Sequence, residues 1–361
     1  MAEVLHLTGP ILRGPDEVVG QAWVIGGRLT FERPAGSHDV TTLAGHVVPG
    51  LVDAHSHIGL DGHGATDEAT AEQQALTDRD AGTLLIRDAG SPMDTRWVHD
   101  RDDLPKLVRA GRHIARTRRY IRNYAWEVEP EQLVEQVRLE ARSGDGWVKL
   151  VGDWIDRDRG DLAPCWPVDV LTEAIAAAHE EGVRVTAHCF GEESLHDFAA
   201  AGTDCIEHAT GLTPGSLEAS AAQGISIVPT LINIDTFPSI AATAEEKFPG
   251  YAAHMRDLHA RRHATIGAAR EAGIPIYVGT DAGGTIAHGL AVDEMEELVT
   301  AGFSPVEALD AGAWAARAWL RHPGLEEGAD ADLLVLDGDP RLDLSALRAP
   351  RAIVLRGRTV S

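Results

Sequence analysis

The sequence predicts an α/β fold, a (β/α)8 TIM barrel accompanied by a small β-sandwich-like domain that both chain ends build together. First, eight short apolar segments alternate with helical segments between residues 47 and 328. Second, a glycine follows most of the expected helices, as at Gly82, Gly182 and Gly202, where a left-handed residue would end a helix. Third, no G-x-G-x-x-G follows the first strand, which argues against a dinucleotide-binding sheet.

The barrel is expected over residues 47–328. Apolar runs rich in β-branched residues predict its strands, which we place at 47–57, 83–90, 112–116, 147–153, 183–189, 204–210, 225–230 and 274–281. The helices are expected at 66–81, 130–142, 168–181, 192–201, 214–223 and 255–272, with a further helix at 290–302 and helical sequence at 304–320.

The two chain ends share a strand-and-turn texture. Residues 1–46 contain LHLTGPIL and QAWVIGGRLTFE, in which Gly26-Gly27 is typical of a hairpin turn. ADLLVLDGD (331–339) and RAIVLRGRTV (351–360) have the same character. We therefore expect 1–46 and 329–361 to form one small β domain. The alternative is two unrelated edge strands.

Composition limits the classes of partner. The chain has 361 residues and a net charge of −24, so it should repel nucleic acid and anionic membranes. No apolar run approaches the ~20 residues of a membrane span, and the N-terminus lacks a secretory signal pattern. Cys165, Cys189 and Cys205 form no CxxC and cannot all pair. We expect a cytoplasmic protein that acts on a small molecule, and we leave homo-oligomerisation open.

Residues that can hold a metal stand at the ends of five expected strands. His55 and His57 lie two apart on the first strand, so their imidazoles should point the same way. Lys149 interrupts an apolar strand, where an amine is costly unless it is paired or chemically altered. The remaining candidates end the fifth, sixth and eighth strands: His188, His208 and Asp281. Each has a structural alternative, such as a backbone hydrogen bond or a helix cap. Together, at the end of a barrel that carries its chemistry, they favour a metal site.

This pattern resembles the amidohydrolase superfamily. The resemblance rests on His-x-His, Lys, His, His and Asp at those strand ends and on the local sequences VPGLVDAHSHIG, WVKLVGD, TAHCFG, CIEHATG, VGTDAGG and GADADLLVLDGDP. It covers nearly the whole chain. Within the superfamily the sequence is most similar to the dipeptidase and imidazolonepropionase-like group, which includes binuclear-zinc Xaa-Pro and Xaa-Arg peptidases.

The resemblance implies a metal-dependent hydrolase with two divalent ions, most typically zinc. His55, His57 and Asp281 would hold the more buried ion, and His188 and His208 the more exposed one. Lys149 would be carboxylated by CO2, and its carbamate would bridge the ions. A bridging hydroxide would then attack a carbonyl carbon of a C–N bond, with Asp281 as proton shuttle and His208 as a second catalytic residue.

Two other functions stay open. In the first, a mononuclear cyclic-amide hydrolase or deaminase would bind one ion through His55, His57, His188 and Asp281, with Lys149 unmodified. In the second, the barrel would be catalytically silent and would act as a binding protein.

The expected pocket loops depart from the group. Where many of its peptidases carry a GGH-type stretch, residues 111–126 read GRHIARTRRYIRNYAW. Arg118, Arg119 or Tyr120 could grip a substrate carboxylate there, although a solvated basic patch is an equal alternative. Trp154, in the next loop, and His288, after the eighth strand, are further candidates for substrate contact. His254, His259 and His263 share one helix, where an exposed polar face is favoured over a second metal site.

Overall fold

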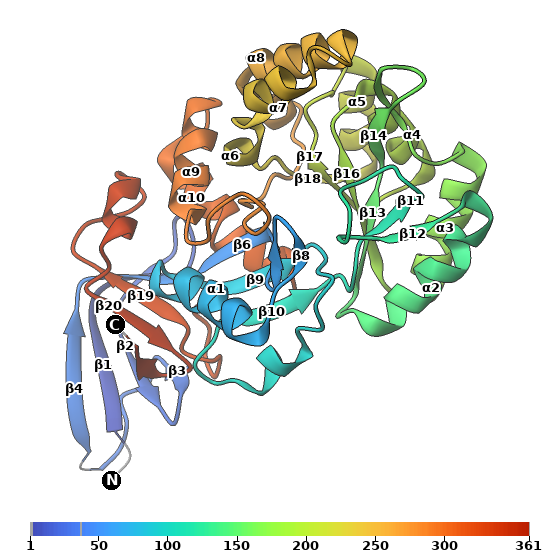
Figure 1. The fold of residues 1–361 in the computed structure, drawn as a ribbon. Helices are drawn as coiled ribbons and strands as arrows, with labels where there is room; N and C mark the ends of the chain where they lie inside the picture. Colours follow the sequence, from blue (N-terminus) through green and yellow to red (C-terminus); the bar gives the residue numbers. More distant parts are fainter. Residues whose placement is uncertain (1–2, 37, 361) are drawn as a thin grey trace.

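The computed structural model of the protein describes residues 3–36 and 38–360. Its strands and helices alternate in a TIM-barrel-like α/β fold with an additional β domain beside it (Figure 1). Among the described residues, no helix combines the length and the apolar character that a membrane crossing requires.

One mixed sheet joins the two ends of the chain. Its order is β21-β20-β19-β5-β1-β2-β3, with β4 paired to β1. The strands are β1 (Glu3–Leu12), β2 (Val18–Ile25), β3 (Arg28–Thr30), β4 (Asp39–Ala44), β5 (His46–Pro49), β19 (Leu333–Leu336), β20 (Ala352–Leu355) and β21 (Arg358–Thr359).

The antiparallel pairing of β19 with β5 brings the two ends together, and Gly26 and Gly27 form the expected hairpin turn with φ of 56° and 83°. A sandwich-like pair of sheets was expected, but the hydrogen bonds place all eight strands in one sheet. Its core includes Leu7, Val24 and Leu333. The domain boundaries at residues 46 and 329 stay a prediction.

Parallel strands of the larger unit form two sheets. A three-stranded sheet contains β6 (Leu51–Ser56), β9 (Thr83–Asp88) and β10 (Lys106–Arg109). A six-stranded sheet has the order β12 (Trp126–Val128), β11 (Ile114–Arg116), β13 (Trp147–Val151), β16 (Arg184–Cys189), β17 (Cys205–His208) and β18 (Ser226–Val228). Single bridges from Ile276 to Ile227 and from Ala282 to Ser56 place the last segment between β18 and β6. The carboxyl ends of the parallel strands consequently face one side.

Two expected strands differ from the structure. The third was expected at 112–116, and β11 (Ile114–Arg116) lies there, but it pairs with β12 and β13. The strand beside β9 is Lys106–Arg109, which was not expected. Residues 274–281 form no ladder, because their hydrogen bonds are divided among three neighbours. Tyr277 donates to Ile227, Val278 donates to Ala311, and Val278 accepts from Ala54.

The helices lie largely where expected. They are α1 (Glu68–Asp80), α2 (Leu133–Ser143), α3 (Val168–Glu180), α4 (Glu192–Ala201), α5 (Pro214–Gln223), α8 (Pro249–Glu271), α9 (Ala291–Thr300), α10 (Pro305–Ala311) and α11 (Trp314–Trp319). Gly202 and Gly224 end α4 and α5 in the left-handed conformation.

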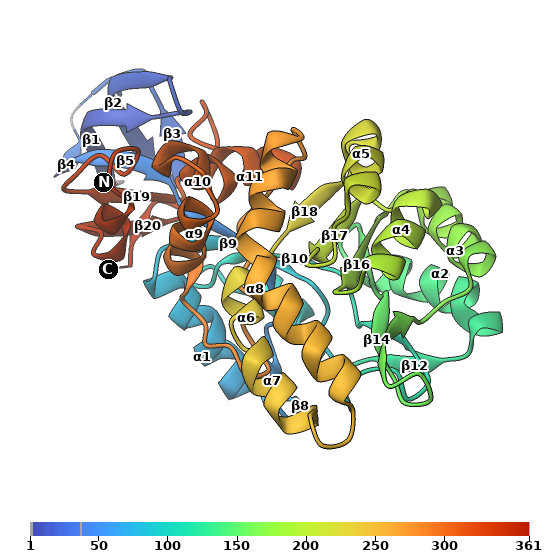
Figure 2. The same cartoon turned by 90° about the horizontal axis from the view of Figure 1, so that it is seen from above.

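Several elements in the connections were not predicted. They are α6 (Leu231–Ile234), α7 (Phe237–Ala244), the short pairs β7 (Leu60–Asp61) with β8 (Gly64–Ala65) and β14 (Asp153–Asp156) with β15 (Asp161–Pro164), and the 3-10 turns η1 (Arg96–Asp100) and η3 (Leu344–Arg348). The 3-10 turn η2 (Pro130–Gln132) forms the start of the helix expected at 130–142. Figure 2 shows α7 lying beside α8. Together with β14 and β15, α6 and α7 extend the protein beyond the carboxyl ends of the strands.

Candidate metal centre

His55, on β6, and His57, directly after β6, have their Nε2 atoms facing each other. Both side chains are buried, and the two Nε2 atoms lie 3.2 Å apart. Each Nδ1 faces an acceptor, because His55 Nδ1 is 2.7 Å from Glu207 Oε2 and His57 Nδ1 is 2.6 Å from Gly90 O. An acceptor at Nδ1 fixes the hydrogen there and leaves the Nε2 lone pair free. The strand therefore offers two lone pairs to one point.

Asp281 brings a carboxylate to the same point. Its Oδ1 lies 2.9 Å from His57 Nε2 and 3.1 Å from His55 Nε2, while its Oδ2 accepts a hydrogen bond of 2.7 Å from Asn233 Nδ2. One carboxylate oxygen and two imidazole lone pairs in mutual contact form a donor set that suits a cation.

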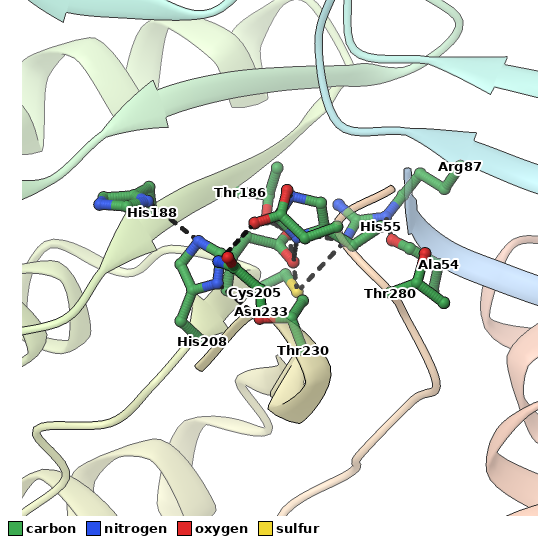
Figure 3. Close-up of polar contacts among 12 residues, drawn as sticks. Ala54, His55, Arg87, Thr186, His188, Cys205, His208, Thr230, Asn233 and Thr280 are labelled. Atoms are coloured by element: carbon green, nitrogen blue, oxygen red, sulfur yellow. Dashed lines mark hydrogen bonds and ion pairs between the residues drawn. The ribbon is translucent and has the colours of Figure 1, made fainter. Parts of the chain in front are cut away.

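A second pair of histidines lies opposite, at the ends of β16 and β17. His188 Nδ1 is 2.9 Å from His208 Nε2, a contact drawn between the two labelled rings in Figure 3, and His208 Nδ1 is 2.7 Å from Thr230 Oγ1. His188 Nε2 is buried without a hydrogen-bond partner. Burial, followed by the charge of Lys149, lowers the pKa of His188 to about 3, and burial and His188 hold the pKa of His208 well below its usual value. Both rings are therefore neutral, which is the form that ligates metals.

The ligand candidates on β6 and Asp281 lie next to the histidine pair of β16 and β17. One ligand atom each from His55, His208 and Asp281 lie within 4.8 Å of one another. Lys149, on β13, is also buried, and burial lowers the pKa of its amine while the charges of Glu207 and Asp281 oppose that effect. The structure thus brings the five predicted histidine and aspartate ligands together and leaves Lys149 in the same charged interior. Their roles as metal ligands stay a proposal.

Glu207 was not predicted as a site residue. It accepts hydrogen bonds from His55, from Thr186 and, at 2.6 Å, from Arg87. Arg87 also donates to Ala54 O, and both of these residues are labelled in Figure 3. Burial would raise the pKa of Glu207, but Arg87 and His55 hold it well below its usual range. This buried ion pair fixes the orientation of the His55 ring.

The strand pattern hid Glu207, since alternation on β17 would turn it away from the face of His208. His208 has φ of 68°, so the pleat breaks there and both side chains reach the interior. His113 was also missed. Its ring is stacked 5.0 Å from that of His57, and its Nδ1 is buried without a partner. The only signal for it was its place in the unusual stretch 111–126.

An aromatic pocket of about 140 Å³ opens beside the centre. It reaches His57, His188 and Asp281, and its other walls carry mainly aromatic and aliphatic side chains, among them Tyr120, Ile121, Tyr124, Trp154, Phe190, Phe237 and Ile240. The rings of Tyr120 and Trp154 meet edge to face at 4.9 Å. Burial holds the pKa of Tyr120 well above its usual value, so its phenol stays neutral. Two of the predicted contact residues, Tyr120 and Trp154, therefore line this pocket.

The other predicted contact residues lie elsewhere. Arg119 pairs with Asp156 at 2.8 Å and donates to the carbonyls of Trp154 and Ala163, so it fastens its loop to the β14–β15 hairpin. Arg118 faces a separate surface hollow. His288 Nδ1 lies 2.8 Å from Asp78, and His288 is not among the residues that line the aromatic pocket.

The three histidines of α8 do not converge. His254 bridges Asp161 and Glu192, at 2.9 and 3.0 Å. His259 lies 3.4 Å from Asp235, and His263 lies 2.7 Å from Glu297. Each ring thus contacts its own acid, which gives no support to a second metal site on this helix.

Comparisons with known proteins identify the family of this chain and its fold. A model of the amidohydrolase family matches residues 46–360. An uncharacterized protein of Mycobacterium tuberculosis is 52% identical over 356 residues, which are 98% of this chain and 95% of that protein. A solved Xaa-Pro dipeptidase with bound methionine shares the fold with a TM-score of 0.82 at 21% identity, covering 100% of both chains. Aspergillus niger ochratoxinase does so with 0.81 at 19% identity, covering 99% of this chain and 95% of its own. The chain therefore belongs to the amidohydrolase family, as the resemblance of its strand-end motifs predicted.

Proposed function

We propose that the protein is a metal-dependent amidohydrolase that cleaves a C–N bond in an amide or peptide-like linkage of a small molecule. The observation that carries this proposal is the meeting of Asp281 Oδ1 with the Nε2 atoms of His55 and His57, three acceptors within 3.2 Å of one another. A cation is the group that such a set accommodates, and nitrogen and oxygen ligands of this kind are those of Zn²⁺.

The residues divide into two ligand groups. His55, His57 and Asp281 would hold one ion. His188 and His208 would hold the other, through the ring nitrogens that face each other at 2.9 Å. Lys149 would supply a carbamate between them, because burial lowers the pKa of its amine and the neutral amine is the form that adds CO2. When bound, the ions would activate water as a nucleophile near neutral pH and polarise the carbonyl of the scissile bond.

The protein's own groups would position the substrate and move the proton. Asp281 Oδ1 faces the histidines, so Oδ2 is the oxygen left to take a proton from the attacking water and return it to the leaving amine. The hydrogen bond from Asn233 fixes the direction of this oxygen. Tyr120 and Trp154 would hold an apolar part of the substrate and exclude water from the bond.

His208 was also predicted to be catalytic. Its Nδ1 faces Thr230, and its Nε2 faces His188 in the second ligand pair, which leaves neither nitrogen to carry a proton to the substrate. We therefore assign His208 to holding the second ion beside the scissile bond.

Replacement of the proton carrier tests the proposal. Asp281→Asn keeps one oxygen for the metal and loses the base, so we expect turnover to fall by at least about 100-fold, with most of the bound metal retained. Hydrolysis of N-acyl amino acids, dipeptides and cyclic amides would be measured beside metal content by mass spectrometry. Asp235→Asn, which changes a partly exposed acid next to His259, is the matched control. Wild-type rates in the Asp281 variant would contradict the proposed shuttle.

A further inference from the structure

A second hollow lies against the loop that walls the aromatic pocket. It has a volume of about 620 Å³, and we call it the arginine hollow because it is lined by Arg112, Arg118, Arg122 and Arg157, together with Tyr120, Asn123, Ala125 and Glu127. The loop 118–125 separates the two spaces, since Ile121 and Tyr124 line the pocket. Tyr120 lines both spaces. The two spaces therefore adjoin at the Tyr120 side chain.

The guanidinium groups of the hollow lack acidic partners. Within residues 3–36 and 38–360, Arg118, Arg122 and Arg157 make no ion pair at 4.0 Å or less. Their neighbours in the chain do pair, Arg119 with Asp156 and Arg159 with Glu193. Such a concentration of unpaired cations is notable in a chain with a net charge of −24, where carboxylates are abundant. Glu127 is the one acidic side chain among the lining residues, so the hollow keeps a positive charge.

The backbone around the hollow is held in place. Arg112 donates to the carbonyls of Tyr124 and Asn123, at 2.9 and 3.1 Å, and its guanidinium stacks 4.4 Å from the Trp126 ring. Arg118 and Asn123 adopt positive φ of 61° and 69°, a conformation that few non-glycine residues adopt.

Further bonds tie the loop to its neighbours. The Asn123 amide donates to His63 O, and the Tyr124 hydroxyl donates to Asp61 O. Arg119 fastens the other side of the loop to β14 and β15. The three unpaired arginines thus extend from a backbone that hydrogen bonds hold in place. A ligand would therefore have to order the side chains but not the loop.

We propose that the arginine hollow binds a carboxylate of the substrate, whose apolar part occupies the aromatic pocket. This inference rests on the proposed function and narrows its substrate class to anionic amides with an aromatic or aliphatic body. A guanidinium offers a planar fork that matches a carboxylate, and here several forks face one space. Among the described residues that line the aromatic pocket there is no lysine or arginine, so the hollow provides the charge for this selection.

Binding of ligands without a C–N bond tests the inference apart from hydrolysis. The probes are 4-phenylbutyrate and the neutral 4-phenylbutan-1-ol, titrated calorimetrically into the metal-loaded protein. Loss of two or more charge-assisted hydrogen bonds should weaken binding at least about ten-fold. We therefore expect wild type to prefer the acid by that factor and the triple variant Arg118→Gln, Arg122→Gln, Arg157→Gln to lose the preference. Arg159→Gln, two residues from Arg157 on the same turn, should keep it.

Several results would overturn the inference. Equal affinity of wild type for both probes would do so, as would a preference that survives in the triple variant, because the acid would then be binding at the metal centre. If the triple variant fails to fold, the double variant Arg122→Gln, Arg157→Gln, which changes two exposed side chains, decides the question. A protein that hydrolyses no amide but shows the arginine-dependent preference would overturn the proposed function alone. Equal hydrolysis of acids and neutral amides would overturn the carboxylate subsite alone.

Discussion

At the residue scale, the buried Glu207 links the metal centre to the rest of the interior. It fixes His55 through Nδ1 and neutralises Arg87, which is wholly buried over the ring of Trp147. Such a partner behind a ligating histidine sets the ring's tautomer and orientation. Removing its charge should therefore affect both metal affinity and folding.

We expect Glu207→Gln to weaken metal binding by about 10- to 100-fold, because the amide has one acceptor oxygen for the two donors His55 and Arg87, and His55 loses the charged acceptor that orients it. The same change leaves the Arg87 charge buried and unpaired, which should cost about 3–5 kcal/mol of unfolding free energy. Competition with a chelator and urea denaturation would measure the two effects. Glu193→Gln, which removes an exposed pair with Arg159, should cost at most about 1 kcal/mol. Unchanged metal affinity in the Glu207 variant would show that it does not position His55.

The sequence allowed the six ligand candidates to be named because each stands at or near the carboxyl end of a strand, where a parallel barrel gathers side chains. Glu207 escaped because the positive φ of His208 breaks the alternation that a strand pattern assumes. Arg119 was predicted to contact the substrate, but it holds the β14–β15 hairpin instead. Its partners Asp156 and Ala163 lie on a hairpin whose position the sequence does not specify.

At the element scale, His254 links three elements, which are α8, β15 and α4. Its ring lies between Asp161 on β15 and Glu192 on α4, while His254 itself belongs to α8. Hydrogen bonds to these two acids raise its pKa from 6.5 to about 9, although burial opposes the shift. The folded state therefore favours the protonated ring more strongly than the unfolded chain does.

This shift has a defined dependence on pH. The stabilisation is complete below pH 6.5, where both states are protonated, and it is lost as pH rises through 9. We expect His254→Gln to lower the melting temperature clearly at pH 6 and much less at pH 10. His259→Gln, on the same helix beside the single acid Asp235, is the control. A melting-temperature gap of equal size at both pH values would contradict the assignment.

Elements with regular periodicity were predicted well, whereas those defined by their neighbours were not. Helices such as α3 and α4 begin within a residue of their expected starts, because apolar spacing and a following glycine mark them. The segment 274–281 forms no ladder because its hydrogen bonds are divided among three neighbours. Its Gly279 packs so closely against Val228 and His55 that a Cβ at this position would lie 2.3 Å from a Val228 methyl. Short α6 follows Thr230, whose φ of 48° is set by the fold and not by the residue type.

At the scale of the whole molecule, metal should contribute to stability as well as to activity. A ligand that binds only the folded state adds about 2.7 kcal/mol when present at 100 times its dissociation constant. We expect a chelator to lower the melting temperature and added Zn²⁺ to restore it. Metal analysis should give close to two equivalents. About one equivalent would favour the mononuclear alternative, and none, with no effect of the chelator, would favour a silent binding protein.

The pairing of β19 with β5 sets an order of events during synthesis. The early strands β1 and β2 can form their antiparallel ladder soon after they leave the ribosome, but β5 gains its partner on the other side only when Leu333–Leu336 has been made. Nearly three hundred residues separate these two strands. The nascent chain must therefore carry an incomplete sheet with an open edge through most of its translation, and the ribosome-bound protein is the form most exposed to pairing with another copy.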